Sequence, residues 1–278
     1  TDLEVYRVLD PRTMESGITH RMVTENLGAF FSLAAVCPGA VHLEWNGAHA
    51  VRSTVPSPAF NIAVLTPRTP LEPFLRFLGD HKAHATWLVV GEPSAPLQAA
   101  IEASGCQSTS DLHVMIARTV APTSGPGNVA VSVVEASDTA GVGSWARLVA
   151  DGFELRASEE ATVLSEVARA CVENPRAALL LACIDGSPVG AAVIVASSGC
   201  AGLHNVATTK AVRGRGVATA IVHHALDFAH AQGSEYLLVA AEPEAAGFWA
   251  RVGFTGTLRI SRFLGTSAPA PASELGIP

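Results

Sequence analysis

The sequence predicts a mixed α/β fold in which two similar domains follow one another, each with a central mixed β-sheet flanked by helices. Short apolar runs of strand length alternate with amphipathic helical patterns along most of the chain. The order strand, loop, helix, strand, helix, strand also occurs twice, and Asn61-Ile62-Ala63-Val64 in the first series corresponds to Asn205-Val206-Ala207-Thr208 in the second. A repeated order of elements indicates internal duplication.

Composition places the chain among globular proteins. Of 278 residues 49% are apolar and 15% are charged, which is enough to fill real hydrophobic cores. No apolar run reaches the roughly 18 residues of a membrane span, and the first residues lack the pattern of a signal peptide. The five cysteines are widely spaced and odd in number. We therefore expect a cytoplasmic protein with reduced thiols and no membrane contact.

Net charge and histidine spacing argue against binding of nucleic acid and of metal ions. A formal net charge of −7 argues against nucleic acid, which requires a basic face, and favours a cationic acceptor such as an amine. Ten histidines are present, but none belongs to an HExxH motif or another recognised set of metal ligands. We expect no metal site.

The first half contains the following expected elements in order. Alternating residues predict a hairpin whose strands meet at Asn46-Gly47, a strong turn signal. The remaining boundaries follow from apolar periodicity and from Pro and Gly breakers. We expect strands at 3–8, 40–45, 48–54, 60–64, 86–90 and 112–117, and helices at 14–33, 72–84 and 96–104.

The second half begins after a stretch rich in Pro and Gly. This composition predicts a linker at residues 121–130 between domains at 1–120 and 131–264, and residues 265–278 read as a flexible tail. Ser137-Asp138 caps the first helix of the second domain. We expect further helices at 158–172, 217–231 and 245–252, and strands at 179–184, 189–196, 201–208, 235–241 and 257–263.

A Gly-rich turn, Arg213-Gly214-Arg215-Gly216, lies between an apolar strand and an amphipathic helix. Glycines admit a ligand to the main chain, and the following helix offers unpaired N–H groups at the positive end of its dipole. Such a turn binds phosphate. A dinucleotide-binding fold would place a third Gly or Ala where Thr219 stands and an acidic residue near Glu235. A surface turn that only caps the helix is the other alternative.

The turn resembles the motif of the GCN5-related N-acetyltransferases, the GNAT family, in which it holds the pyrophosphate of acetyl-CoA. Ala245, Trp249 and Gly253-Phe254 match a later segment of that family. The resemblance implies tandem GNAT-type domains. It also implies cofactor contacts at Val206, Ala207 and Thr208 for the pantetheine arm, and at Arg213, Gly214, Arg215, Gly216, Val217, Ala218 and Thr219 for the pyrophosphate.

The same resemblance implies an activity. The enzyme would move acetyl from acetyl-CoA directly to an amine of a small molecule or peptide, with the acceptor pocket formed by residues 137–175. The first copy has Thr66-Pro67-Arg68-Thr69-Pro70-Leu71 in place of the Gly-rich turn, so we expect it not to hold CoA. Alternatives are a CoA-binding regulatory or scaffold module, or transfer of a longer acyl group beside the small residues Ala191, Ala192, Ala207 and Ala240. Either a monomer or a homodimer fits the sequence.

Proton transfer is where the chain departs from the family. Trp249 stands where a Tyr commonly protonates CoA, and Glu242 stands where an Asn is common. For a general base the candidates are His204 beside the cofactor strand, Glu154 after Gly152-Phe153, and Glu242 acting through water. Each also fits an ordinary structural role, namely a hydrogen-bonded strand histidine, a surface carboxylate and a solvated strand end. Asp151 is a weaker fourth candidate.

Overall fold

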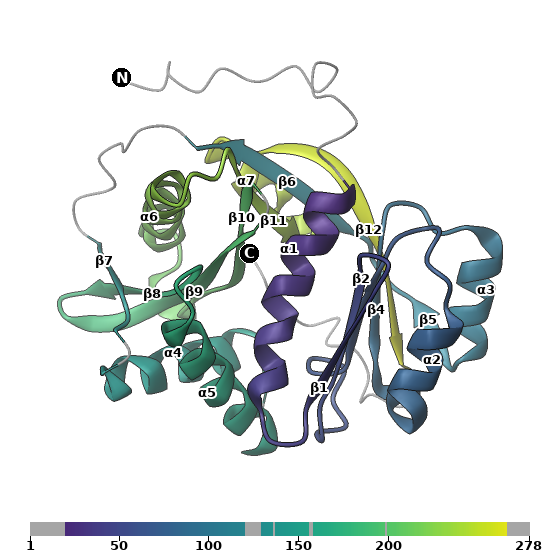
Figure 1. The fold of residues 1–278 in the computed structure, drawn as a ribbon. Helices are drawn as coiled ribbons and strands as arrows, with labels where there is room; N and C mark the ends of the chain where they lie inside the picture. The colour runs from purple at the N-terminus through teal and green to yellow at the C-terminus, as the bar shows by residue number, and fades with distance from the viewer. Residues whose placement is uncertain (1–19, 120–128, 136, 156–157, 198, 266–278) are drawn as a thin grey trace.

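The structure is a computed structural model that describes residues 20–119, 129–135, 137–155, 158–197 and 199–265. The expected strand at 3–8, the expected helix before residue 20 and the tail after residue 265 lie outside these residues. A mixed α/β architecture is confirmed, with one large sheet flanked by helices (Figure 1).

The strands of both halves form a single 12-stranded sheet in the order β1-β2-β3-β4-β12-β6-β11-β10-β9-β8-β7, with β5 paired to β12. The pairs β3–β4 and β10–β11 are parallel, and the others are antiparallel. The strands are β1 (Val41–Trp45), β2 (Ala48–Arg52), β3 (Ile62–Leu65), β4 (Thr86–Val90), β5 (Cys106–Ser108), β6 (Leu112–Arg118), β7 (Ala130–Val133), β8 (Ala177–Ile184), β9 (Ser187–Ser197), β10 (Cys200–Thr208), β11 (Tyr236–Ala241) and β12 (Thr255–Gly265).

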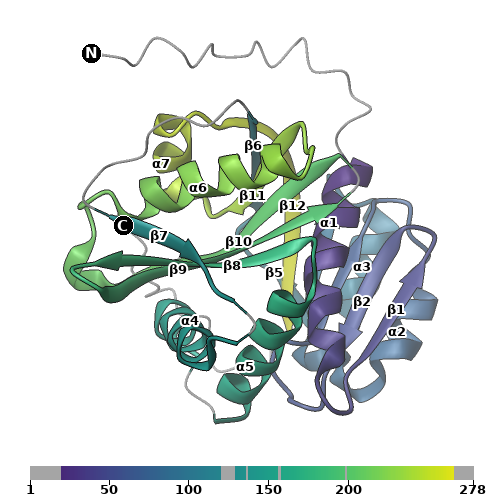
Figure 2. The same ribbon diagram turned by 60° about the vertical axis from the view of Figure 1, so that its left-hand side comes forward.

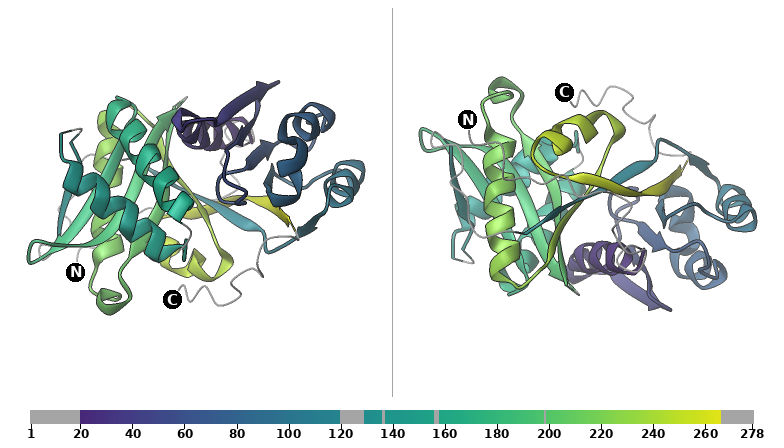
Figure 3. Two further views of the ribbon diagram at one scale, coloured as in Figure 1. Left: turned by 90° about the horizontal axis from the view of Figure 1, so that it is seen from below. Right: turned by 90° about the horizontal axis from the view of Figure 1, so that it is seen from above.

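Helices cover both faces of the sheet. The helices are α1 (His20–Ser32), α2 (Glu72–Leu78), α3 (Ala95–Ala103), α4 (Thr139–Gly152), α5 (Ser158–Glu173), α6 (Val217–Ala231) and α7 (Ala246–Arg251). Figure 2 shows α6 and α7 on one face of the C-terminal strands and α4 and α5 on the other. Helix α1 lies on the α4 and α5 side, between the two halves (Figure 3). No helix in the described ranges is long and apolar enough to cross a membrane.

Alternation along β8 explains the two layers of core. Leu179 and Leu181 pack with α4 and α5, while Leu180 and Ala182 pack with α6. All four are buried, as expected for a strand covered on both faces. The near-continuous run of apolar residues therefore indicates a strand that is covered on both faces of the sheet.

The last strand of each half lies beside the other half. Strand β6 stands between β11 and β12, while β12 stands between β4 and β6. Read outward from the β6–β12 pair, each side continues with an antiparallel neighbour and then a parallel pair. The sheet order is thus similar on its two sides, and the two halves share their central strands.

This shared centre predicts that neither half folds alone. A fragment of residues 129–278 lacks β6, whose buried Met115, Ile116 and Ala117 cover β11. We expect it to be unfolded or aggregated because β11 would become an exposed apolar edge. Circular dichroism and size-exclusion chromatography of each fragment test this, with the full chain cleaved between residues 119 and 129 as the control that stays associated. A fragment 129–278 that melts cooperatively by itself would contradict it.

Several boundaries differ from the expected ones. The helix expected at 72–84 ends at Leu78, because Gly79 adopts φ of 53° and the chain continues as a 3-10 turn. Strands β5 and β7 were not expected, and β7 extends into the stretch read as linker. The expected cap is confirmed, since the Asp138 side chain accepts a hydrogen bond from Gly141 N at 2.8 Å.

Candidate functional site

Strands β10 and β11 separate part of the way along their length. They pair only where Cys200, Ala201 and Gly202 face residues 236–238, although β10 continues to Thr208. The β9–β10 register shifts between His204 and Ala207. Asn205 adopts φ of 52° at this bulge, a conformation that Asn tolerates better than most residues. The end of β10 therefore borders a gap in which its backbone groups have no ladder pair with β11.

The Gly-rich turn follows this strand end after a short 3-10 turn at Lys210–Val212. Gly214 and Gly216 have φ of 78° and 83°, and a Cβ placed on Gly214 would meet no atom within 4 Å. The first helical bond of α6 runs from Ala220 N to Gly216 O at 2.9 Å. The N–H groups of residues 217–219 therefore precede the hydrogen-bonded helix and are available to an anion.

The expected cofactor residues surround this turn. Val206 and Thr208 are half-buried at the end of β10, and Ala207 is buried between them. Arg213 Nε donates to Thr208 O at 3.4 Å, which links the turn to the strand. Gly214 and Arg215 are exposed, Ala218 and Thr219 are half-buried, and Val217 is buried in the core. A contact at Val217 would thus come from its backbone.

Helix α4 ends against the same strand. A Cβ added to Gly152 would come within 2.7 Å of Ala207 Cβ, so this glycine permits the close approach. Two residues later Glu154 has φ of 56°, and its carboxylate lies 3.9 Å from Lys210 Nζ. A left-handed non-glycine residue costs about 1–2 kcal/mol and is a frequent feature of functional sites. The fold thus brings Glu154 to Lys210, which lies between β10 and the Gly-rich turn.

His204 is held in a buried hydrogen-bonded position. Its Nε2 lies 3.0 Å from Asn26 Oδ1, and its ring stacks on Phe30 with centroids 4.2 Å apart. Because Asn26 Nδ2 donates to Val195 O, the Asn26 oxygen accepts, and Nε2 of His204 carries the proton. Burial lowers the pKa of His204 to about 3. A ring with these properties is a weak base, and the geometry does not favour it for amine deprotonation.

Burial of His204 predicts acid sensitivity. The pKa of His204 is about 6.5 in the unfolded state and lower in the folded state. The contribution of the neutral ring to the free energy of unfolding is therefore complete above pH 6.5 and is lost between pH 6.5 and about 3. We expect the free energy of unfolding to fall by about 2 kcal/mol from pH 7.5 to pH 5 through this residue. Urea unfolding at both pH values should show that fall reduced by this amount in His204→Gln. An equal fall in both proteins would contradict this.

Glu242 is engaged in a different contact. Its carboxylate accepts two hydrogen bonds from Arg262, at 2.6 and 3.1 Å, and Arg262 also donates to Ser110 Oγ at 2.7 Å. This pair joins the end of β11 to β12 and to the loop before β6. Since β11 has already separated from β10, Glu242 lies across the gap from the turn. The structure does not bring Glu242 and Glu154 into contact.

Trp249 is buried and packs edge-on against Phe254, with ring centroids 5.2 Å apart. It belongs to the hydrophobic core beneath α6. An indole N–H supplies no proton at neutral pH. The side chain therefore serves packing, and a proton for a leaving thiolate would come from elsewhere.

The N-terminal counterpart of the gap is closed. Strands β3 and β4 pair from Ile62–Thr86 to Leu65–Val89, the last residue of β3 included. The following turn is closed by Thr69 N donating to Thr66 O at 3.1 Å. The two parallel pairs of the sheet thus differ at the point where a ligand would enter.

Two residues at the site were missed by sequence reasoning. Lys210 approaches Glu154 only through the tertiary fold, and no pattern in the chain predicts it. Asn205 carried a usable signal, since an Asn within an apolar strand is a common site of left-handed backbone. Among the described residues no three His, Cys, Asp or Glu side chains are grouped to hold a metal ion.

Comparisons with known proteins identify a matching family model and similar folds. Residues 145–254 match the model of the Acetyltransferase (GNAT) family. A GCN5-related N-acetyltransferase from Kribbella flavida has a similar structure, with TM-score 0.61, 16% identity, and coverage of 90% of this chain and 96% of that chain. A search of curated protein sequences gave no significant match.

Two further solved structures are similar over most of the chain. A GCN5-related N-acetyltransferase from Sphaerobacter thermophilus has TM-score 0.52 and 16% identity, with coverage of 92% of this chain and 93% of that chain. A tandem GNAT protein from the clavulanic acid biosynthesis pathway has TM-score 0.51 and 15% identity, with coverage of 94% and 98%. At these identities the likeness establishes a shared fold.

Proposed function

We propose, from the match of residues 145–254 to the acetyltransferase (GNAT) family model, that the chain is an N-acetyltransferase that moves acetyl from acetyl-CoA to an amine of a small molecule or peptide. The family transfers acyl groups from acyl-CoA. The observation that carries the proposal is the separation of β10 from β11 beside a Gly-rich turn that opens a helix. A gap that leads to an anion site suits acetyl-CoA, which is an extended thioester with a pyrophosphate near its far end.

The proposed substrate contacts follow from this arrangement. The backbone of Val206, Ala207 and Thr208 would bind the amides of the pantetheine arm, and the N–H groups of residues 214 and 216–219 would bind the pyrophosphate. The exposed Arg215 adds a positive charge near that anion. Room at Gly214 supports this fit, because a Cβ there would meet nothing within 4 Å.

We assign proton abstraction to Glu154. The amine nitrogen attacks the acyl carbonyl, a C–N bond forms, the C–S bond breaks, and the amine proton passes to the carboxylate directly or through one water. The CoA thiolate takes its proton from solvent, since Trp249 supplies none. Contact of α4 with Ala207 supports Glu154, because it places this loop over the strand that borders the gap. The long contact with Lys210 leaves the carboxylate available for a cationic acceptor.

One acyl-CoA site per chain is part of the proposal, with residues 131–264 as the acyl-CoA-binding domain and residues 1–120 as a degenerate copy. Continuous pairing of β3 with β4 supports this, because no gap opens there for a pantetheine arm. Pro67 and Pro70 in the following turn offer no N–H groups to a phosphate.

The test is release of CoA thiol from acetyl-CoA with a panel of monoamines, diamines, amino acid amides and dipeptides. We expect thiol release above the hydrolysis rate with at least one amine, and an increase of the product mass by one acetyl group. Propionyl-CoA and octanoyl-CoA in parallel test the acyl preference beside the buried Ala191 and Ala192. A protein that binds acetyl-CoA but releases no thiol with any amine would contradict the enzyme assignment.

A CoA-binding module without catalysis is the second candidate. Burial of Trp249 at the position of the expected acid favours it, because the site then lacks a protein group that protonates the thiolate. In that case Glu154→Gln would change neither binding nor any measurable rate.

A further inference from the structure

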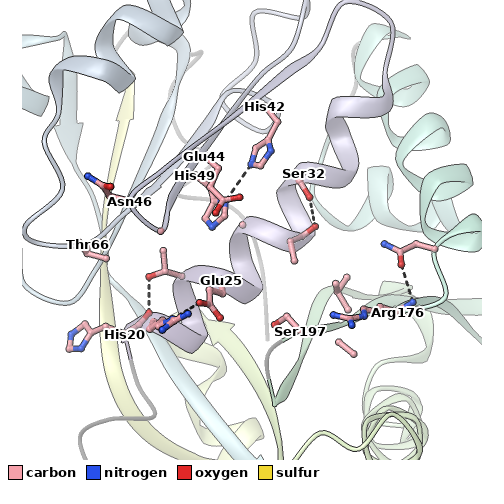
Figure 4. A pocket seen from close by; sticks show the side chains of 18 residues that line it. His20, Glu25, Ser32, His42, Glu44, Asn46, His49, Thr66, Arg176 and Ser197 are labelled. Atoms are coloured by element: carbon pink, nitrogen blue, oxygen red, sulfur yellow. Dashed lines mark hydrogen bonds and ion pairs between the residues drawn. The ribbon is translucent and has the colours of Figure 1, made fainter.

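A cavity lies between the two halves of the chain, with α1 as its floor (Figure 4). Its volume is about 850 Å³, within the range of small-molecule sites. The β1–β2 hairpin forms one wall. The turn at Asn174 to Arg176 and the end of β9 form the opposite wall. Because the end of β9 pairs with the first residues of β10, this cavity lies at the opposite end of β10 from the Gly-rich turn.

An unpartnered histidine lines this cavity. His49 is 8% exposed, and its Nε2 has no hydrogen-bond partner among the described residues. Its Nδ1 lies 3.3 Å from His42 Nε2, and the two rings are parallel within 5°. Burial lowers the pKa of both histidines, so the pair is neutral at neutral pH. A buried polar atom without a partner costs about 1–3 kcal/mol unless a ligand or water satisfies it.

Helix α1 is shaped around the His49 ring. A Cβ at Gly28 would come within 2.3 Å of His49 Cδ2, so only glycine admits the ring at this point. Glycine inside a helix costs about 0.5–1 kcal/mol relative to alanine. Gly28 thus allows the His49 imidazole, which belongs to the hairpin wall, to lie directly against the helix backbone.

Charges of both signs stand on opposite walls. Figure 4 shows Glu44 beside His42 and His49 on the hairpin side of α1, and Arg176 with Ser197 on the other side. Both Glu44 and Arg176 are exposed, and within the described ranges neither takes part in a salt bridge. Between them Arg21 and Glu25 form an ion pair on the floor, so their charges compensate each other. A ligand spanning the cavity would meet one net negative and one net positive wall.

We propose that this cavity binds a zwitterionic short peptide, with its ammonium group toward Glu44 and its carboxylate toward Arg176. His49 Nε2 is itself closed to the cavity because it lies against Gly28, so the two end charges of the peptide carry its recognition. The cavity volume exceeds that of a single amino acid and suits two or three residues. This site is separate from the proposed acyl-CoA site and does not depend on it.

The test is calorimetric titration of dipeptides Xaa-Ala, with each of the twenty standard residues as Xaa, into the full-length protein. We expect saturable binding of at least one dipeptide. Its N-acetylated and its C-amidated forms should each bind at least about tenfold weaker, because one charge-assisted contact is lost. Glu44→Gln and Arg176→Gln should each weaken the parent dipeptide by a similar factor.

Two control variants test whether the dipeptide binds in this cavity. Glu72→Gln/Arg76→Gln removes a matched pair of exposed charges on α2, outside the cavity, and should leave binding unchanged. Gly214→Glu should also leave it unchanged, so failure of the acyl-CoA assignment would not affect this result. No saturable binding of any dipeptide, or binding by the Glu44→Gln and Arg176→Gln variants as tight as that of the wild type, would overturn the proposal.

Discussion

Gly214→Glu is expected to weaken acetyl-CoA binding at least about 100-fold, because it places a carboxylate where the pyrophosphate binds. The exposed turn has room for the side chain, so the glutamate does not clash with the protein. It instead repels the pyrophosphate and occupies its space. The left-handed backbone, with φ of 78°, adds a folding cost of about 1–2 kcal/mol for any residue with a Cβ. Calorimetric titration with acetyl-CoA measures the affinity, and thermal unfolding measures the cost.

Gly233→Glu provides a matched control at the other end of α6. Gly233 has φ of 71°, is exposed, and a Cβ there would also meet nothing within 4 Å. Both variants add the same charge and a similar backbone strain, so their stabilities should be similar. Only Gly214→Glu should lose acetyl-CoA affinity. Equal affinity of the two variants would remove the turn from the site.

Glu154→Gln is expected to lower kcat by about 100- to 1,000-fold, with the affinity for acetyl-CoA within about twofold of the wild type. The amide cannot accept the amine proton, while the turn and the β10 edge are untouched. The rate is measured by thiol release with the best amine of the panel. Glu173→Gln, which changes an exposed carboxylate at the end of α5, is the control that keeps full activity.

Glu154→Gly separates catalysis from stability. Glycine relieves the left-handed strain at φ of 56°, so the variant should be more stable by up to about 1 kcal/mol while its rate falls as in Glu154→Gln. The ion pair with Lys210 is solvated and long, and its loss costs little. A full rate in either Glu154 variant would show that another group takes the proton.

Many of the helices and strands could be predicted from local sequence patterns. Strand β4 occupies the residues expected for it, and the Asp138 cap starts α4 as expected. Strand β7 was missed because three of its four residues have exposed or polar side chains and it follows a Pro/Gly-rich stretch. The exchange of β6 and β12 was not predictable either, since apolar alternation identifies a strand but not its neighbours.

The features of the site likewise fall into those that local sequence predicts and those that depend on tertiary contacts. The Gly-rich turn and the helix that follows are adjacent in sequence, so a phosphate site could be proposed there from the sequence alone. The separation of β10 from β11, the approach of Glu154 to Lys210 and the burial of His204 by Phe30 depend on residues far apart in the chain. No local pattern encodes those contacts.

The number of acetyl-CoA molecules bound per chain, measured by calorimetric titration of the wild-type protein, tests the central claim most directly. The gap beside β10 and the closed pairing of β3 with β4 predict one molecule per chain. Two molecules would contradict the assignment of a degenerate N-terminal copy. No binding by a folded protein would contradict the assignment of an acyl-CoA site at the Gly-rich turn.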